Sequence, residues 1–389
     1  MKLGDTIYLD HQATTPLDSR ILEAMSPYMA GCFGNPHASE HIIGWRAMQV
    51  VEEAATAVGD LIGADPDEII FTSGATEANN LALLGVARRA AAGKRKRILL
   101  GATEHKCVLE IGRVLRDEIG FAVSHIPVDS AGRLDMDALE AELDEEVLLV
   151  SVMPVNNEIG TIQDVAAISR IVSGYGSLLH CDAAQAPCAL DLSSLTQHAD
   201  LISLSGHKMY GPMGVGALFA RRELHDQMAP IIHGGGQQRG LRSGTLPMPL
   251  CIGLGAAAKL MTGHEATNER KAIAARSDLF KELLEGLPCR VWVNGPTNAA
   301  ERHPGNINLG FEGVQAADLL SRLQPRLAAS TGSACTSGIP EPSHVLRAIG
   351  LSEDEAACSI RFSLGRHTTD DAVKEAARII QDALRVWTH

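Results

Sequence analysis

The 389-residue sequence has few aromatic residues, no closely paired cysteines and no long apolar run. Aromatic side chains make up only 4% of it, whereas glycine occurs 37 times, a composition that suits helices packed closely on a sheet. The eight cysteines form no CxxC pair, and their irregular spacing argues against a zinc ribbon or a disulfide framework. No stretch of 18 apolar residues occurs, so we predict no membrane-spanning helix.

The charge balance excludes further classes of function. Lys and Arg number 34 and Asp and Glu number 47, which gives a net charge of 34 − 47 = −13. Proteins that bind nucleic acid or anionic membranes directly need a basic face, so we expect neither as a partner. The opening residues, MKLGDTIYLDHQATTP, lack the apolar core of a secretory signal. We therefore expect a soluble, cytoplasmic protein.

Short apolar runs alternate with amphipathic segments through the first two thirds of the chain. This alternation is typical of βαβ units and predicts an α/β fold with a mainly parallel, seven-stranded sheet covered on both faces. We assign residues 15–260 to this large domain, with a helix over Arg46–Ile62 and another that Asp135 caps. The predicted strands are Glu68–Thr72, Arg97–Ala102, Ala122–Pro127, Val147–Met153, Ser177–Cys181, Asp200–Leu204 and Val215–Ala220.

The rest of the chain has a different pattern, which predicts a smaller α+β domain formed by residues 1–14 and 261–389. A long helical stretch, Leu250–Leu287, joins the two parts. A helix begins near Ala316, and the last predicted helix covers Asp370–Trp387. The predicted strands here are Arg290–Val293, Asn306–Leu309 and Ser359–Leu364.

Polar or ionisable side chains follow five of the predicted strands. In open parallel sheets, ligands bind outside the carboxyl ends of the strands, so five such strand ends together predict a site at this edge. The segments are Ser73–Glu77, Thr103–His105, Pro154–Glu158, Asp182–Gln185 and Ser205–Lys208.

Three of these segments have chemistry that belongs together. The residues from Gly74 to Thr76 open a helix whose free N–H groups suit a phosphate, although no Walker A motif follows. Asp182 follows an apolar strand, and a buried carboxylate there needs a cation, such as a protonated pyridine nitrogen. Lys208 lies between glycines, where a desolvated amine can form an imine. A phosphate cradle, a buried acid and a nucleophilic lysine match the needs of pyridoxal 5'-phosphate (PLP).

Longer segments resemble a known family over nearly the whole chain. TSGATEANN, ATEHK, VNNEIG, HCDAAQA, SLSGHKMYGPMGVG and RSGTLP resemble the cysteine desulfurases, which belong to the fold-type I, class V aminotransferase-like PLP enzymes. The likeness extends from YLDHQATTP to SIRFSLGR. The segment STGSACTSG resembles the cysteine loop of the group I, NifS/IscS-like desulfurases.

The resemblance implies how PLP is held. Lys208 would bind PLP as an imine, His105 would stack on its ring and relay protons, and Asp182 would pair with the ring nitrogen. The implied contacts to the ring oxygen and the phosphate come from Gln185, Ala75, Thr76, Ser205 and His207, with Asn157 also beside the cofactor. Thr245 would reach the phosphate of a neighbouring subunit, which implies a homodimer with shared active sites.

The resemblance also implies a substrate site and a nucleophile. Asn35, Asn157 and Arg361 would hold the substrate carboxylate, for which the planar fork of arginine is suited. Cys335 lies among small polar residues rather than in an apolar run, and it would receive the sulfur. We expect the other seven cysteines to be apolar fillers or incidental. No histidine spacing indicates a metal site, so we assign none.

The implied reaction converts L-cysteine to L-alanine and leaves a persulfide on Cys335, which passes to a sulfur-acceptor protein. That acceptor could serve iron–sulfur cluster assembly or a dedicated pathway such as DNA phosphorothioation or tRNA thiolation, and the sequence does not choose among them. One alternative is a selenocysteine lyase or another PLP lyase or aminotransferase. Another is a scaffold or sulfur carrier that has lost catalysis, against which the set of Lys208, Asp182, His105 and Cys335 argues.

Overall fold

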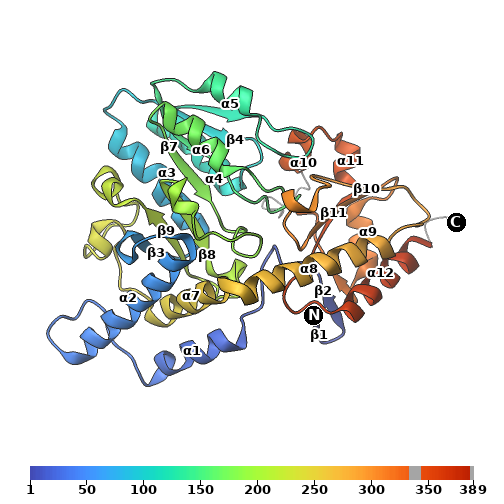
Figure 1. The fold of residues 1–389 in the computed structure, drawn as a ribbon, viewed down its shortest axis with the longest axis horizontal. Coiled ribbons are helices and arrows are strands. Elements are labelled where there is room, and N and C mark those ends of the chain that lie inside the picture. The colour runs from blue at the N-terminus through green and yellow to red at the C-terminus, as the bar shows by residue number, and fades with distance from the viewer. Residues whose placement is uncertain (333–342, 386–389) are drawn as a thin grey trace.

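A seven-stranded sheet forms the centre of the computed structural model, which describes residues 1–332 and 343–385 (Figure 1). The strand order is β3-β9-β8-β7-β6-β4-β5, and β9 alone runs antiparallel to its neighbours. The seven predicted strands and the mainly parallel α/β fold are therefore confirmed. Their bounds are β3 (Ile69–Thr72), β4 (Arg97–Gly101), β5 (Ala122–Ile126), β6 (Val147–Ser151), β7 (Leu178–Asp182), β8 (Leu201–Ser205) and β9 (Gly216–Ala220).

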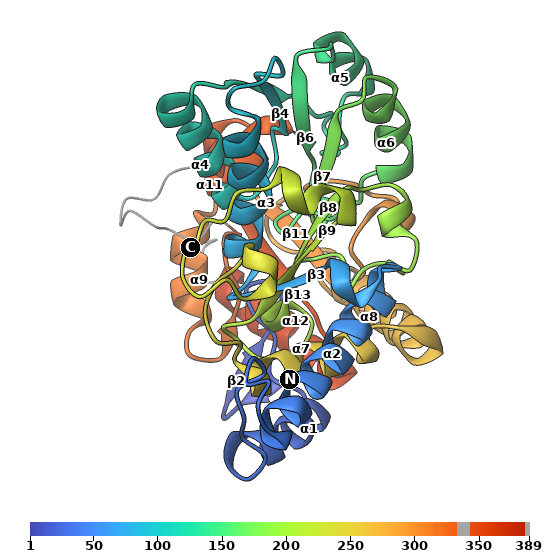
Figure 2. The same cartoon turned by 90° about the vertical axis from the view of Figure 1, so that its left-hand side faces the viewer.

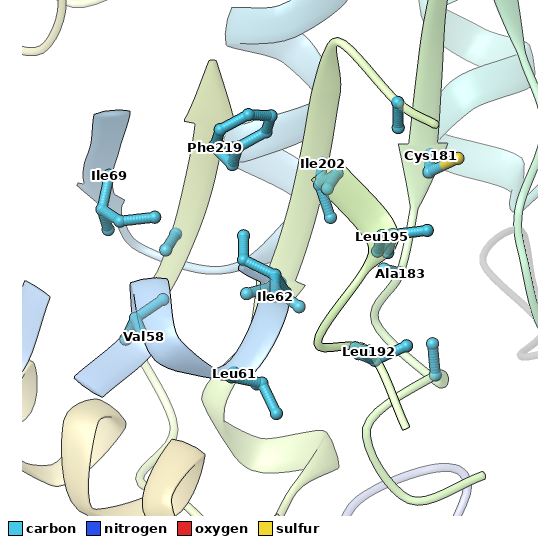
Figure 3. Packing of buried hydrophobic residues seen from close by; sticks show 14 of the residues in the cluster. Val58, Leu61, Ile62, Ile69, Cys181, Ala183, Leu192, Leu195, Ile202 and Phe219 are labelled. Atoms are coloured by element: carbon cyan, nitrogen blue, oxygen red, sulfur yellow. The ribbon is translucent and has the colours of Figure 1, made fainter. Parts of the chain in front are cut away.

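Apolar side chains on both faces of the sheet explain why helices cover both sides. Because successive strand residues point to opposite faces, Ile202 packs into one apolar cluster and Leu201 into another. Figure 3 shows the first face, where Val58 and Ile62 of a helix lie over Phe219 and Ile202. The helices over this face are α2 (Ile42–Ile62), α5 (Met136–Glu142), α6 (Val165–Gly174) and α7 (Met248–Leu260). Those over the other face are α3 (Ala75–Ala90) and α4 (Lys106–Val114).

Local capping sets the ends of several helices. Asp135 caps α5 as predicted, because its side chain accepts a hydrogen bond from the backbone N–H of Ala138. Helix α2 begins four residues before the predicted Arg46, since His41 caps it by accepting from the N–H of Gly44. The same helix ends at Gly63, whose φ of +80° suits glycine.

The predicted helical stretch over Leu250–Leu287 is two helices, α7 and α8 (Gly263–Leu283). The helix breaks after Leu260, where Gly263 has a φ of +77° that interrupts the regular backbone. Figure 1 shows α8 running from α7 toward the C-terminal part of the molecule. Two successive helices therefore join the two parts, rather than one continuous helix.

The C-terminal part has its own sheet and its own apolar cluster. The antiparallel strands β10 (Val291–Val293), β11 (Asn306–Phe311) and β13 (Ser359–Ser363) pack with α9 (Ala316–Leu323) and α12 (Asp370–Arg385). Ile7 and Leu9 from the N-terminus join this cluster. Their placement supports the division into residues 15–260 and residues 1–14 with 261–389, which stays our proposal.

Short elements complete the fold. Strands β1 (Lys2–Leu3), β2 (Thr6–Tyr8) and β12 (Leu327–Ala328) form a third small sheet. The remaining helices are α1 (Ser19–Ala30), α10 (His344–Ala348) and α11 (Glu353–Ala357). Figure 2, which is turned by 90°, places α1 at one end of the molecule and α5 at the other. Within the described ranges, no helix combines the length and the apolar character needed to cross a bilayer.

Candidate active site

Two adjoining cavities lie at the carboxyl ends of the parallel strands. The first, which we call the strand-end cavity, has a volume of about 470 Å³, and each of the five predicted strand-end segments lines it. The second, the junction cavity, has a volume of about 310 Å³ and lies against the N-terminal segment and the C-terminal part. His105, Asn157 and Lys208 line both cavities. These three side chains therefore stand between the two spaces.

The turn after β3 forms an anion cradle in the strand-end cavity. Gly74 has a φ of +151°, which glycine adopts readily, and α3 begins at the next residue, Ala75. The opposing strand leaves room for this turn through Gly216, where a Cβ atom would come within 2.6 Å of the Cα of Gly74. The first N–H groups of α3 have no partner within the helix, so Ala75 and Thr76 offer donors to an anion. Ser205 and His207 line the same space.

A half-buried ion pair holds this turn from behind. Glu77 accepts a hydrogen bond of 2.7 Å from the backbone N–H of Ser73, and the Nε of Arg242 donates to it at 2.8 Å. The guanidinium and the N–H group of Ser73 keep the pKa of Glu77 below its usual value despite burial. Arg242 therefore anchors the cradle without occupying it, since it binds Glu77, which lies in the first turn of α3 behind Ala75 and Thr76.

Asp182 ends β7 and supplies the carboxylate of the strand-end cavity. Its side chain is 4% exposed and accepts hydrogen bonds from the Nδ2 of Asn79 at 2.8 Å and the N–H of Ala184 at 3.1 Å. Both donors are neutral, so they leave the negative charge uncompensated. The neighbouring Cys181 points to the opposite face and packs into the apolar cluster (Figure 3). Such a carboxylate favours a cationic partner in the cavity.

Lys208 lies in the short helical turn after β8, between the two cavities. Its Nζ donates hydrogen bonds to the main-chain carbonyls of Gln12 at 2.6 Å and Ala13 at 2.8 Å. Burial, together with the nearby charge of Arg361, lowers the pKa of Lys208 to about 8. About a tenth of the amine is therefore neutral and nucleophilic at pH 7, far more than for an ordinary lysine.

The N-terminal segment holds the loop that carries Lys208. The backbone N–H and the hydroxyl of Thr15 both donate to the carbonyl of His207, at 2.9 and 2.8 Å. The Thr15 hydroxyl in turn accepts from the N–H of Tyr210 at 2.7 Å. Gln185, which lines the strand-end cavity, donates to the same Gln12 carbonyl as the lysine, at 2.9 Å. No sequence pattern marked residues 12–15 for this role, because these contacts involve mainly backbone atoms.

His105 opens onto both cavities and has a defined tautomer. Its Nδ1 accepts a hydrogen bond of 3.2 Å from the N–H of Cys107, so the neutral ring carries its proton on Nε2. The surrounding protein atoms lower the pKa of His105 by desolvation, while Asp182 opposes that shift. The preceding residue, Glu104, is 1% exposed, and burial raises the pKa of its carboxyl to about 8. Glu104 belongs to the predicted strand-end segment Thr103–His105, but nothing in the sequence pattern indicated that its carboxyl would be buried.

Arg361 is the buried cation of the junction cavity. It lies in the middle of β13 and is 3% exposed. One Nη donates to the carbonyl of Asn157 at 2.7 Å, and the other donates to Asp10 at 2.7 Å and to the hydroxyl of Ser330 at 2.9 Å. Since Asp10 contacts one Nη only, a second carboxylate can approach the guanidinium from the cavity side.

Not every predicted site residue lines a cavity. Asn35 and Thr245 lie on exposed loops and line neither of the two spaces. The side chain of Asn35 instead accepts a hydrogen bond of 3.0 Å from the N–H of His37. Cys335 lies outside the described residues. Gly332, the last described residue before it, and His344, the second described residue after it, both line the junction cavity.

The other cysteines differ in their surroundings. Cys107 lines the strand-end cavity, but burial raises its pKa to about 12, so it remains a thiol. Cys188 donates to the carbonyl of Lys208 at 3.3 Å. Cys32 is exposed. Three others are buried among apolar or backbone atoms: Cys181, Cys251 and Cys358.

Comparison with known proteins identifies the family. A family model described as aminotransferase class-V matches residues 7–375. The chain belongs to the class-V aminotransferase family. Among curated relatives of this class-V enzyme, a protein named cysteine desulfurase IscS from Rickettsia massiliae is 44% identical over 97% of this chain and 91% of its own length.

Solved structures give the same answer for the fold of this class-V family member. A NifS-like protein superposes with a TM-score of 0.90 at 33% identity, covering 98% of this chain and all of that one. A structure titled SspA in complex with cysteine superposes with a TM-score of 0.81 at 34% identity, covering 94% of this chain and 100% of that one. The resemblance to NifS/IscS-like desulfurases that the motifs indicated is confirmed.

Proposed function

We propose that this chain is a PLP-dependent cysteine desulfurase, which takes sulfur from L-cysteine and releases L-alanine. The observation that carries the proposal is the position of Lys208. Its amine, whose pKa is lowered to about 8, stands between the two cavities. The strand-end cavity offers the anion cradle and the buried carboxylate of Asp182. The junction cavity offers the guanidinium of Arg361. The names of the relatives support the same activity.

The donor set of the strand-end cavity fits PLP. The N–H groups of Ala75 and Thr76, with Ser205 and His207, would hold the phosphate. Asp182 would pair with the ring nitrogen, because its two hydrogen-bond donors are neutral and do not compensate its charge. The side chains that would face the ring and its oxygen are those of His105, Asn157 and Gln185. When bound, PLP supplies an electron sink that stabilises negative charge on the substrate.

The junction cavity would bind the amino acid. The guanidinium of Arg361 would hold the substrate carboxylate, with Asn157 beside it. Lys208 would move the α-proton, because a neutral amine next to the substrate can accept it and return it. A related structure whose title includes bound cysteine supports L-cysteine as the ligand. We also propose that Asn35, which lines neither cavity in the single chain, contacts the substrate once the subunits have assembled.

Cys335 would attack the substrate sulfur. An S–S bond forms as the C–S bond breaks, the electron pair stays on the carbon, and that carbon then takes a proton to become the methyl group of L-alanine. The persulfide left on Cys335 would pass to a sulfur-acceptor protein, for iron–sulfur cluster assembly, DNA phosphorothioation or tRNA thiolation. The position of Gly332, a described residue three positions before Cys335 that lines the junction cavity, supports this role.

We further propose a homodimer with shared active sites, in which Thr245 reaches the phosphate held by the partner subunit. Exposed apolar side chains gather on α1, α2 and the loop between them and support a second copy as their cover. They are Leu22, Met29, Phe33, Ile42, Ile43 and Trp45, of which Phe33 is 71% exposed. A cytoplasmic location is part of the same proposal, since the described cysteines are all free thiols.

The test is to measure alanine and sulfide released from L-cysteine with a reductant, on wild type, Cys335→Ser and Cys32→Ser. We expect wild type and Cys32→Ser to make both products in equal amounts, and Cys335→Ser to make neither while keeping its PLP absorbance. A fully active Cys335→Ser would instead favour a selenocysteine lyase or another PLP lyase. A wild type that binds PLP but releases no alanine would refute the desulfurase.

A further inference from the structure

Gln12 is a buried amide of the N-terminal segment that lines the junction cavity together with Lys208 and Arg361. The residue is only 3% exposed, yet one of its polar groups is left over. Its backbone N–H donates to the hydroxyl of Ser363 at 3.0 Å, and its carbonyl accepts from Lys208 at 2.6 Å. Its side-chain Oε1 accepts from the Nδ2 of Asn306 at 2.6 Å. The side-chain Nε2 has no hydrogen-bond partner among the described residues.

A chain of hydrogen bonds fixes which end of this amide is the donor. Arginine can only donate, so the Nη1 of Arg302, at 3.0 Å, must face the Oδ1 of Asn306. The Nδ2 of Asn306 is then the group that faces Gln12, and it also donates to the main-chain carbonyl of Glu158 at 3.0 Å. Because the Oε1 of Gln12 accepts from Asn306, its Nε2 is the end of the amide that is turned away from Asn306.

Arg361 carries a second buried donor without a partner. Its Nε has no hydrogen-bond partner among the described residues, although both of its Nη groups do. Arg361 and Ser363 are two positions apart in β13, so their side chains project from the same face of that strand. The N–H of Gln12 binds the side chain of Ser363, which places Gln12 next to Arg361 on this face. Two residues with a spare buried donor therefore lie together at the junction cavity.

The chemistry of these donors indicates what they bind. A buried donor without an acceptor costs free energy, so such groups normally have a partner. Asp10, which also lines the cavity, already binds an Nη of Arg361. The carboxylate of Glu158 already accepts from the hydroxyl of Ser343. A carboxylate on a ligand brings two acceptor oxygens and a negative charge, which match two donors of which one is cationic.

We propose that Gln12 is a substrate-binding residue whose Nε2 donates to the carboxylate of the amino acid, an inference that rests on the desulfurase function proposed above. One carboxylate oxygen binds the guanidinium of Arg361, and the other accepts from Gln12. An amide in the place of that carboxylate has a single acceptor oxygen and brings N–H donors of its own. The side chain of Gln12 therefore selects substrates with a free carboxylate, while its main-chain carbonyl holds Lys208.

The decisive variant is Gln12→Glu, which keeps an oxygen for Asn306 but replaces the spare donor with a negatively charged acceptor. The measurement is equilibrium binding of L-alanine and of L-alaninamide to the PLP-loaded protein, followed by PLP absorbance. We expect the affinity for L-alanine to fall by about 30-fold, the size of a hydrogen bond to a charged group, and that for L-alaninamide to stay within about threefold. Gln227→Glu, the same change at an exposed residue, is the matched control and should leave both affinities unchanged.

A second variant keeps the proposal testable if Gln12→Glu fails to bind PLP. Gln12→Met has a similar length and removes the donor without adding a charge. We expect its affinity for L-alanine to fall by about tenfold, and its affinity for L-alaninamide to change by less than about threefold.

The outcomes separate this inference from the function on which it rests. A change that acts through Lys208 or through the fold would weaken both ligands equally, because both present the same amino group. Equal losses for the two ligands, or no loss for either, beside a wild type that releases alanine from L-cysteine, would overturn the role of Gln12 alone. A wild type that releases no alanine overturns the desulfurase function, and the inference falls with it. A selective loss of L-alanine beside a normal Gln227→Glu supports the carboxylate contact.

Discussion

The two cavities are built from the chain in different ways. Apart from the partner contact proposed for Thr245, the strand-end cavity takes all its lining residues from one stretch, positions 73–214. The junction cavity takes its lining from positions as far apart as Asp10 and Arg361. The proposed cofactor site is therefore encoded in consecutive strand–turn units, whereas the proposed substrate site depends on folding both ends of the chain against them.

The hydrogen bonds show the same difference. At the anion cradle, the carboxylate of Glu77 accepts a hydrogen bond from the backbone N–H of Ser73, four positions away. In the junction cavity, Arg361 pairs with Asp10 across 351 positions, and Lys208 donates to Gln12 across 196. Lys208 lines both cavities, so it couples a locally encoded space to one that only the complete fold creates. Variants that damage one cavity and spare the other test this distinction.

The largest effect is expected where the cavities meet. Lys208→Ala removes the amine that serves both, so we expect alanine release from L-cysteine to fall by more than about 1,000-fold and covalent PLP absorbance to vanish. Lys271→Ala, an exposed lysine on α8, should match wild type in both measurements. Residual activity within about tenfold of wild type would show that another group does this work.

Arg361→Lys should damage only the junction cavity. Lysine keeps the charge but loses the planar fork, so we expect kcat/KM for L-cysteine to fall by about 100-fold, mostly through KM. PLP absorbance should not change, because Arg361 does not line the strand-end cavity. The exposed Arg347→Lys controls for the substitution itself. A fall in PLP occupancy would mean that the two cavities are not separable.

Gly216→Ala should damage only the strand-end cavity. A Cβ atom there would lie 2.6 Å from the Cα of Gly74 and would push the anion cradle out of place. Overpacking of this kind costs about 1–3 kcal/mol, which, if it falls on PLP binding, corresponds to an affinity weaker by about 5- to 150-fold. Equilibrium titration of the apoprotein with PLP measures it, against Gly174→Ala, where a Cβ atom meets nothing within 4 Å. Unchanged affinity would contradict the cradle.

The smallest effect is on stability at the boundary between the cavities. Burial raises the pKa of Glu104 to about 8, so the folded protein keeps a proton that the unfolded chain releases near pH 4.5. The stability that this group contributes is full below about pH 4.5 and is lost as the pH rises to about 8. Glu104→Gln removes that loss, so we expect its Tm to exceed wild type by about 5 °C at pH 8.

This difference in Tm should shrink toward pH 5, where the wild-type carboxyl is protonated in both states or nearly so. Thermal melts at pH 5, 6.5 and 8 measure it. The exposed Glu110→Gln should show no such trend. A Tm difference that does not depend on pH would mean that Glu104 keeps its ordinary pKa.

The limits of the sequence follow from the same contrast. Gly74, Asp182 and Lys208 were identified from local pattern, because a polar residue after an apolar strand is visible without any knowledge of the fold. Arg361 came only from the resemblance, since nothing near it in sequence marks it as a ligand. The carbonyl of Gln12 left no signal at all, because main-chain acceptors carry no residue identity.

By itself, the sequence determined the succession of strands and helices along the chain and the polar groups at their ends. Period-two alternation and helix capping depend on a few neighbouring residues, so the sequence alone reveals them. Only the tertiary structure decided that Asp10 meets Arg361, that Gln12 holds Lys208 and that His344 shares their cavity. Those contacts exist because apolar clusters pack the two chain ends against the sheet, and burial is a property of the whole fold.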